Sequence, residues 1–149
     1  MVPDRIEREL MLRHPVERVW QALTTAEGLA GWFGSAAEID LRPGGRLWMR
    51  WESLDVEAEA TVTVVEPPHR FGYRWGIEGL LPDDPHRNDV VFTLSPTADG
   101  TRLHVVESGF DQVAEDVGRA AHKDNSEGWD SELADLVAYL DSAGYGATA

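Results

Sequence analysis

Apolar and polar side chains alternate along most of the chain between residues 46 and 107. This period of two is typical of β-strands with one buried and one solvated face. The clearest such segments are 46–51, 58–64, 71–75, 90–94 and 103–107. Turns rich in proline and glycine separate several of them, so consecutive strands are expected to pair antiparallel. The chain therefore has to build a curved sheet that needs a cover on its apolar face.

Helical patterns stand on both sides of this region. Residues 5–12 read as a further strand, and His14-Pro15 opens a short helix because proline suits the first helical position. Thr24 or Thr25 can cap a second short helix, and a short strand is expected over residues 37–41. The whole pattern predicts an α+β fold: two short helices after the first strand, then about six to seven antiparallel strands, then a long terminal helix.

The terminal helix, from about residue 113, has an inward stripe of mixed character. Around Trp129 the stripe contains Leu133, Leu136 and Leu140 toward the end of the helix, but Asn125, His122 and Gly118 toward its start. A sheet that grips this helix would leave a gap where the helix presents small or polar residues. We therefore expect a concave, aromatic-walled pocket there, provided that Gly118 and Gly128 leave the helix continuous.

Size and charge limit the function classes. The 149 residues suit one domain, expected over 1–149 with a core at about 5–142 and a loose tail at 143–149. The net charge of −14 makes nucleic acid and anionic membranes poor partners, and it arises entirely after residue 50. This acidity is interpreted as the outer face of the shell, with an acidic docking surface as the alternative. The start resembles no signal peptide, so a cytoplasmic protein is expected.

Metal and cofactor sites are not indicated. There are no cysteines, and the five histidines do not share metal-ligand spacing. Gly44-Gly45 joins two strands and no lysine follows, so it reads as a turn rather than a phosphate loop. We expect no metal and no cofactor.

Two polar residues are candidates for acid–base chemistry. Glu107 is in phase with Leu103 and Val105 and should point toward the core, where it could act as a general acid or base. Alternatively it accepts hydrogen bonds from a turn or from an arginine such as Arg74, or a bulge rotates it outward. His122 could orient a ligand or relay a proton, or could be a satisfied or half-exposed histidine. No catalytic residue is assigned beyond these two.

Aromatic side chains dominate the remaining candidates. At strand and helix period they are usually core, but in a sheet wrapped around a helix the core wall is also the cavity wall. The expected cavity residues are Trp32, Trp51, Tyr73, Trp75, Glu107, Phe110, Gly118, His122, Asn125 and Trp129.

Several motifs resemble those of a known family in order and spacing. They are Pro15-Val16-Glu17-Arg18-Val19-Trp20, Leu29-Ala30-Gly31-Trp32-Phe33-Gly34, Asp40-Leu41-Arg42-Pro43-Gly44-Gly45-Arg46, Val65-Glu66-Pro67-Pro68-His69-Arg70-Phe71, Gly100-Thr101-Arg102-Leu103, Glu107-Ser108-Gly109-Phe110 and Gly128-Trp129. The sequence thereby resembles the SRPBCC (START-like, helix-grip) superfamily, in the branch called activator of heat shock protein 90 ATPase homologue-like. The resemblance implies a helix-grip fold, whose members bind lipids, hormones and polyketides, and only some of which catalyse reactions.

Three functions follow as hypotheses. The first is a domain that binds a hydrophobic small molecule, apolar or aromatic, without catalysis. The second is a cyclase-, dehydratase- or hydrolase-like enzyme that uses Glu107 and His122 around one ligand, as in polyketide cyclase-like members. The third is a chaperone-associated protein, which exposed apolar area near Trp32-Phe33 would favour. In the co-chaperones a separate N-terminal domain contacts the chaperone, and this sequence begins directly at the first strand, which disfavours that role.

Overall fold

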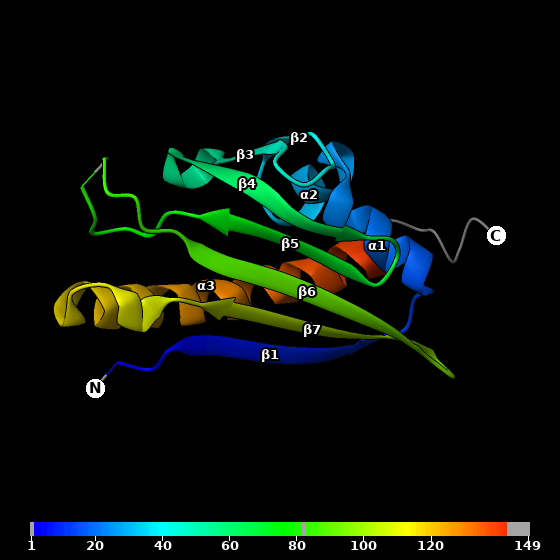
Figure 1. The fold of residues 1–149 in the computed structure, drawn as a ribbon. Coiled ribbons are helices and arrows are strands. Elements are labelled where there is room, and N and C mark those ends of the chain that lie inside the picture. The colour runs from blue at the N-terminus through cyan, green and yellow to red at the C-terminus, as the bar shows by residue number, and fades with distance from the viewer. Residues whose placement is uncertain (1, 82, 143–149) are drawn as a thin grey trace.

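The computed structural model of the protein describes residues 2–81 and 83–142, and shows one curved sheet gripping a long helix (Figure 1). In chain order the elements are β1 (Arg5–Leu12), α1 (Val16–Thr24), α2 (Ala26–Trp32), β2 (Ala36–Ile39), β3 (Arg46–Trp51), the 3₁₀ turn η1 (Glu52–Leu54), β4 (Val56–Glu66), β5 (Arg70–Trp75), β6 (Asn88–Thr97), β7 (Gly100–Ser108), the 3₁₀ turn η2 (Phe110–Gln112) and α3 (Glu115–Ser142). The predicted fold class is confirmed.

The seven strands form one antiparallel sheet in the order β1-β7-β6-β5-β4-β3-β2. The first strand therefore pairs with the last, with Arg5 opposite Ser108 and Leu12 opposite Thr101. From β3 to β7 each strand pairs with the next one in the chain, as the alternation predicts. In Figure 1, α3 runs behind the sheet, while α1 and α2 lie at one end of it, close to β2.

The terminal helix is continuous from Glu115 to Ser142, so neither glycine interrupts it. It begins two residues later than expected. Its buried residues are Gly118, Ala121, Trp129, Leu133, Leu136 and Leu140. They face apolar side chains of the middle strands, among them Phe71, Tyr73 and Phe92, none more than 1% exposed. No helix in the described part of the chain is both long and apolar enough to span a bilayer.

The short strand β2 ends at Ile39, two residues before the expected end. The cause is a turn: the amide of Arg42 donates to the carbonyl of Asp40, and the amide of Gly45 donates to the carbonyl of Arg42. The chain thus leaves the sheet at Asp40 and re-enters it as β3. Residues 143–149, expected to form a loose tail, lie outside the described residues.

The two short helices pack closely against each other where α2 begins. Thr25 caps α2 by accepting a hydrogen bond from the amide of Gly28 at 2.9 Å. The Trp32 indole donates to the carbonyl of Ala22 at 2.9 Å, which ties the end of α2 to α1. A Cβ added at Gly28 would lie 2.7 Å from the carbonyl oxygen of Gln21, so only glycine permits this approach.

We expect Gly28→Ala to destabilise the protein by about 2 kcal/mol, because backbone atoms must move to admit the methyl group. Urea unfolding followed by circular dichroism measures this. The control is Gly76→Ala, where an added Cβ meets nothing within 4 Å, and it should change stability by less than about 1 kcal/mol. Equal effects of the two substitutions would contradict this close packing of the two helices.

Candidate functional site

The carboxylate of Glu107 lies at the centre of a buried hydrogen-bond network. It projects inward from β7, is 1% exposed, and accepts hydrogen bonds from four neutral side chains. Trp75 Nε1 and Asn88 Nδ2 donate to Oε2 at 2.8 and 3.1 Å. Trp129 Nε1 donates to Oε1 at 2.9 Å, and Asn125 Nδ2 lies 3.1 and 3.0 Å from the two oxygens. Two indoles and two amides from β5, β6 and α3 thus converge on one anion.

This network leaves Glu107 little capacity for chemistry. Its contacts are N–H donors, which suit an ionised carboxylate because that group only accepts hydrogen bonds. Arg74, an expected partner, instead donates to Asp89 on the outer face at 2.7 Å. Behind Asn88 lies His86, whose Nε2 is 2.7 Å from Asn88 Oδ1. These hydrogen bonds connect the sheet to the helix, which indicates a structural role for Glu107.

The Gly109 turn allows Asn88 to come this close. Gly109 has φ of 116°, in the left-handed region, and a Cβ there would lie 2.6 Å from Asn88 Oδ1. The next residue, Phe110, is fully buried beside α3. The motif Glu107-Ser108-Gly109-Phe110 therefore combines a buried anion, a turn that only glycine fits and an aromatic anchor.

The start of α3 is packed, in contrast to the gap expected there. A Cβ at Gly118 would lie close against the carbonyl oxygen of Phe110, so this glycine marks a tight contact rather than a cavity. The His122 ring meets the edge of Phe110 with centroids 5.1 Å apart, and its Nε2 lies 3.1 Å from the Arg5 carbonyl oxygen. Among the described residues, His122 is not one of the hydrogen-bond partners of Glu107.

An aromatic pocket of about 250 Å³ opens about one turn further along the helix, and we treat it as the candidate site. Its lining residues come from α2, β3, η1, β5 and α3. They are Phe33, Trp51, Leu54, Trp75, Asn125, Gly128, Trp129, Ser131 and Glu132. Four of the ten expected cavity residues are among them, namely Trp51, Trp75, Asn125 and Trp129.

The pocket continues into a wider depression of about 690 Å³ toward the surface. The two share Phe33, Trp51, Leu54, Ser131 and Glu132, and the wider one adds Trp32, Gly34, Ser35, Glu52, Ser53 and Asp135. Leu54, which is 68% exposed, is an apolar residue at this mouth. The inner aromatic pocket, with Asn125, Ser131 and Glu132 as its polar residues besides the indoles, has the usual character of a small-molecule site.

Phe33, which the sequence did not predict to be a cavity residue, lies among the aromatic rings that line the pocket. Its ring is stacked on Trp129 at 5.7 Å and on Trp75 at 5.9 Å, and it meets the edge of Trp51 at 5.4 Å. It stands at the C-cap of α2, where its amide donates to the Leu29 carbonyl. Its place beside Trp32 in the Leu29–Gly34 motif was the available signal.

Glu132 is another lining residue that the sequence did not predict, as are Leu54, Gly128 and Ser131. Half-buried on α3, it accepts a hydrogen bond from Trp51 Nε1 at 3.2 Å. Burial raises the pKa of its carboxyl from 4.5 to about 7; the nearby charge of Asp135 adds to this, and the Trp51 hydrogen bond opposes it. A carboxyl that titrates near neutrality and lines a pocket is a candidate binding or proton-transfer group.

Tyr73 lies deeper, with its ring against Trp75 at a centroid distance of 5.2 Å. Its hydroxyl is buried and has no hydrogen-bond partner among the described residues. Burial raises the pKa of this hydroxyl well above 10, and the charges of Glu107 and Glu132 raise it further. The charges of Glu107 and Glu132 therefore act on the Tyr73 hydroxyl in the core behind the pocket.

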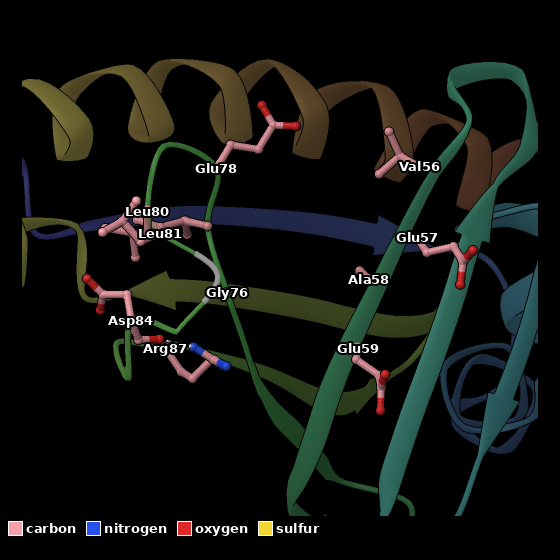
Figure 2. A pocket seen from close by; sticks show the side chains of 11 residues that line it. Val56, Glu57, Ala58, Glu59, Gly76, Glu78, Leu80, Leu81, Asp84 and Arg87 are labelled. Atoms are coloured by element: carbon pink, nitrogen blue, oxygen red, sulfur yellow. Dashed lines mark hydrogen bonds between the residues drawn. The ribbon is translucent and has the colours of Figure 1, made fainter.

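A second depression, of about 360 Å³, has a different character. Ala60 is opposite Trp75, the last residue of β5, so residues 56–59 of β4 run past the end of β5. Figure 2 shows this stretch facing the 76–87 loop, with Glu78 under α3 and Arg87 across from Glu59. Besides Glu59, Glu78 and Arg87, the charged lining residues are Glu57 and Asp84. The apolar Leu81, also in the lining, is 74% exposed. This charged groove suits an apolar ligand less well than the aromatic pocket does.

Metal binding has no support in the described part of the chain. Among those residues there is no group of three or more His, Asp or Glu positioned to hold a metal ion.

Comparison with known proteins gives a family and several similar structures. The family model described as Activator of Hsp90 ATPase homolog 1-like protein matches residues 13–141. Protein MLL2253 from Mesorhizobium loti has a similar structure, with a TM-score of 0.79 and 28% identity over 92% of this chain and 96% of that one. A search of the curated proteins found no match.

Two further structures extend this picture. DynU16, a protein in the dynemicin biosynthetic locus, has a TM-score of 0.77 and 25% identity over 95% of this chain, but over only 48% of its own. An AHSA1-like protein from Aeromonas hydrophila has a TM-score of 0.72 and 20% identity over 94% of each chain, a likeness of fold alone.

We expect Glu107→Gln to lower the free energy of unfolding by about 3 kcal/mol, because an amide cannot accept from all four donors and leaves buried N–H groups unpaired. Urea unfolding measures this. The matched control is Glu9→Gln, exposed on β1, which should change stability by less than about 0.5 kcal/mol. A loss as small as that of the control would mean that the network does not stabilise the fold.

We expect the Trp51 indole N–H resonance to titrate with a midpoint of about pH 7, as its acceptor Glu132 ionises. Nuclear magnetic resonance follows it, and Glu132→Gln should abolish the transition. Asp135→Asn should move the midpoint to lower pH, because it removes a charge that raises the pKa of Glu132. The pKa of Glu132 in the folded protein exceeds its ordinary value of 4.5, so the folded state binds this proton more tightly than the unfolded state does. The resulting contribution to the free energy of unfolding is present at low pH and is lost as the pH rises through about 7. A pH-independent Trp51 resonance would contradict this assignment.

Proposed function

Because the chain belongs to the family of Activator of Hsp90 ATPase homolog 1-like proteins, we propose that it is a START-like domain that binds a small apolar or aromatic molecule in its aromatic pocket. The observation that carries this proposal is the pocket itself. Four of its nine lining residues are aromatic, and the exposed Leu54 extends the apolar surface to its mouth. Burial of a hydrophobic ligand there would remove both the ligand and Leu54 from water.

The pocket volume indicates the size of the ligand. An apolar cavity of about 150 Å³ holds a benzene ring. The pocket, at about 250 Å³, has room for a fused two-ring system, and a larger compound would extend into the wider depression. The likeness to DynU16, from a biosynthetic locus, also supports a small molecule as the partner.

Trp32 and Phe33 contribute little exposed apolar surface that would favour a chaperone-associated role. They are 4% and 2% exposed, and the exposed apolar side chain at this end is that of Leu54. Their rings instead support the pocket from within, with centroids 4.8 Å apart.

A second candidate is proton transfer to the bound molecule. It would use Glu132 in place of Glu107 and His122, and it is favoured by the position of Glu132 on the pocket wall and its pKa of about 7. Conversion of a bound compound to a product, lost in Glu132→Gln, would distinguish catalysis from binding alone.

We expect Gly128→Leu to weaken binding of the uncharged fluorescent probe N-phenylnaphthylamine at least about tenfold, because the new side chain would occupy the pocket. A Cβ at Gly128 meets no atom within 4 Å, so the substitution fills space without a clash at its base. Fluorescence titration measures the affinity.

The matched control is Ala134→Leu, which adds apolar atoms to the exposed face of the same helix and should leave probe affinity unchanged. Thermal unfolding checks that both variants are folded. Probe binding that survives Gly128→Leu undiminished would place the ligand elsewhere and overturn the proposal.

A further inference from the structure

In the aromatic pocket, the side-chain N–H donors are engaged by the protein, whereas oxygen acceptors are left for a ligand. The N–H groups of its polar side chains are already engaged: Trp75 and Trp129 donate to Glu107, and Trp51 donates to Glu132. The amide nitrogen of Asn125 also points to Glu107. These residues leave a ligand mainly aromatic surface and the oxygen acceptors of Asn125 and Glu132. The remaining polar side chain of the lining is Ser131, whose hydroxyl can donate or accept.

The mouth of the pocket also offers a ligand negative charge rather than positive charge. Glu52 and Asp135 line the wider depression together with Glu132, and no described residue that lines either hollow is a lysine, arginine or histidine. Three backbone donors there are engaged as well. The amide of Gly34 donates to Leu29, that of Ser35 donates to Arg50, and that of Glu52 donates to the Ser35 hydroxyl. A carboxylate or phosphate on a ligand would find carboxylates facing it and no cation to pair with.

A positive charge would find the opposite environment. The rings of Trp51, Trp75 and Trp129 line the hollow, with Phe33 stacked on one side of Trp75 and of Trp129. Organic cations bind favourably over the faces of such rings. Glu132 at the wall supplies a carboxylate whose cost of ionisation a bound cation would offset. Aromatic walls and one half-buried carboxylate together are the recognition chemistry of an ammonium group.

We propose that the pocket selects its ligand by charge, taking an aromatic or apolar compound that carries an ammonium group, with that group against the Glu132 carboxylate. This inference rests on the proposed small-molecule function and narrows it. It assigns Glu132 as a specificity-determining residue, and it excludes fatty acids and aromatic acids as ligands. Glu107, whose oxygens accept from four protein donors, holds the indole rings in place and is not assigned to the ligand.

Three probes on one skeleton test the proposal: naphthylmethylamine, naphthylmethanol and naphthoate, titrated by calorimetry at about pH 8, where Glu132 with a pKa of about 7 is ionised. We expect the amine to bind at least about tenfold more tightly than the alcohol, and naphthoate to bind most weakly. In Glu132→Gln the amine should lose its advantage while the affinity of the alcohol stays within about twofold.

The matched control separates the pocket from the net charge of −14. Glu78→Gln removes the same charge from the rim of the other depression (Figure 2), and it should leave the preference for the amine unchanged. Equal losses in Glu78→Gln and Glu132→Gln would show a general field and overturn the proposal. Equal binding of the three probes, or preference for naphthoate, would overturn it while leaving the proposed function intact. Binding of none would overturn both.

Discussion

The structure depends on one buried anion held by neutral donors. Glu107 reaches from β7 to Trp75 on β5, Asn88 on β6 and both Asn125 and Trp129 on α3. Taking a carboxylate out of water is costly, and the cost is offset only while all these donors stay in place. The sheet and the helix are therefore held at one relative position. The two indole rings, with their N–H groups turned to the carboxylate, present their carbon surface to the pocket.

The two inward carboxyls of the site differ because their surroundings differ. Glu107 has four donors and no access to solvent, whereas Glu132 has one donor and lies at the open end of the pocket. Two like groups with opposite environments commonly divide structural and chemical roles. Here the satisfied carboxylate organises the wall, and the less satisfied one is available to a ligand.

The alternation of side chains and the helical stripe were enough to predict the sheet, the long helix and the inward direction of Glu107. They could not place the gap along the helix. The few residues between Ser108 and Glu115 draw the start of α3 against η2, so Gly118 and His122 meet Phe110 instead of a cavity. Glu132 escaped prediction because a glutamate beside Trp129 on a helix wheel looks like part of the solvated face.

The pairing of β1 with β7 has a consequence for how the chain reaches this state. Arg5 is paired with Ser108, so β1 is synthesised long before β7, the strand with which it pairs. Contacts so distant in sequence carry a large loop-closure entropy and slow the folding of β-rich domains. The hairpins from β3 to β7 can form locally, whereas β1 can join only at the end. During synthesis its exposed edge is the segment most open to wrong pairing or to a chaperone.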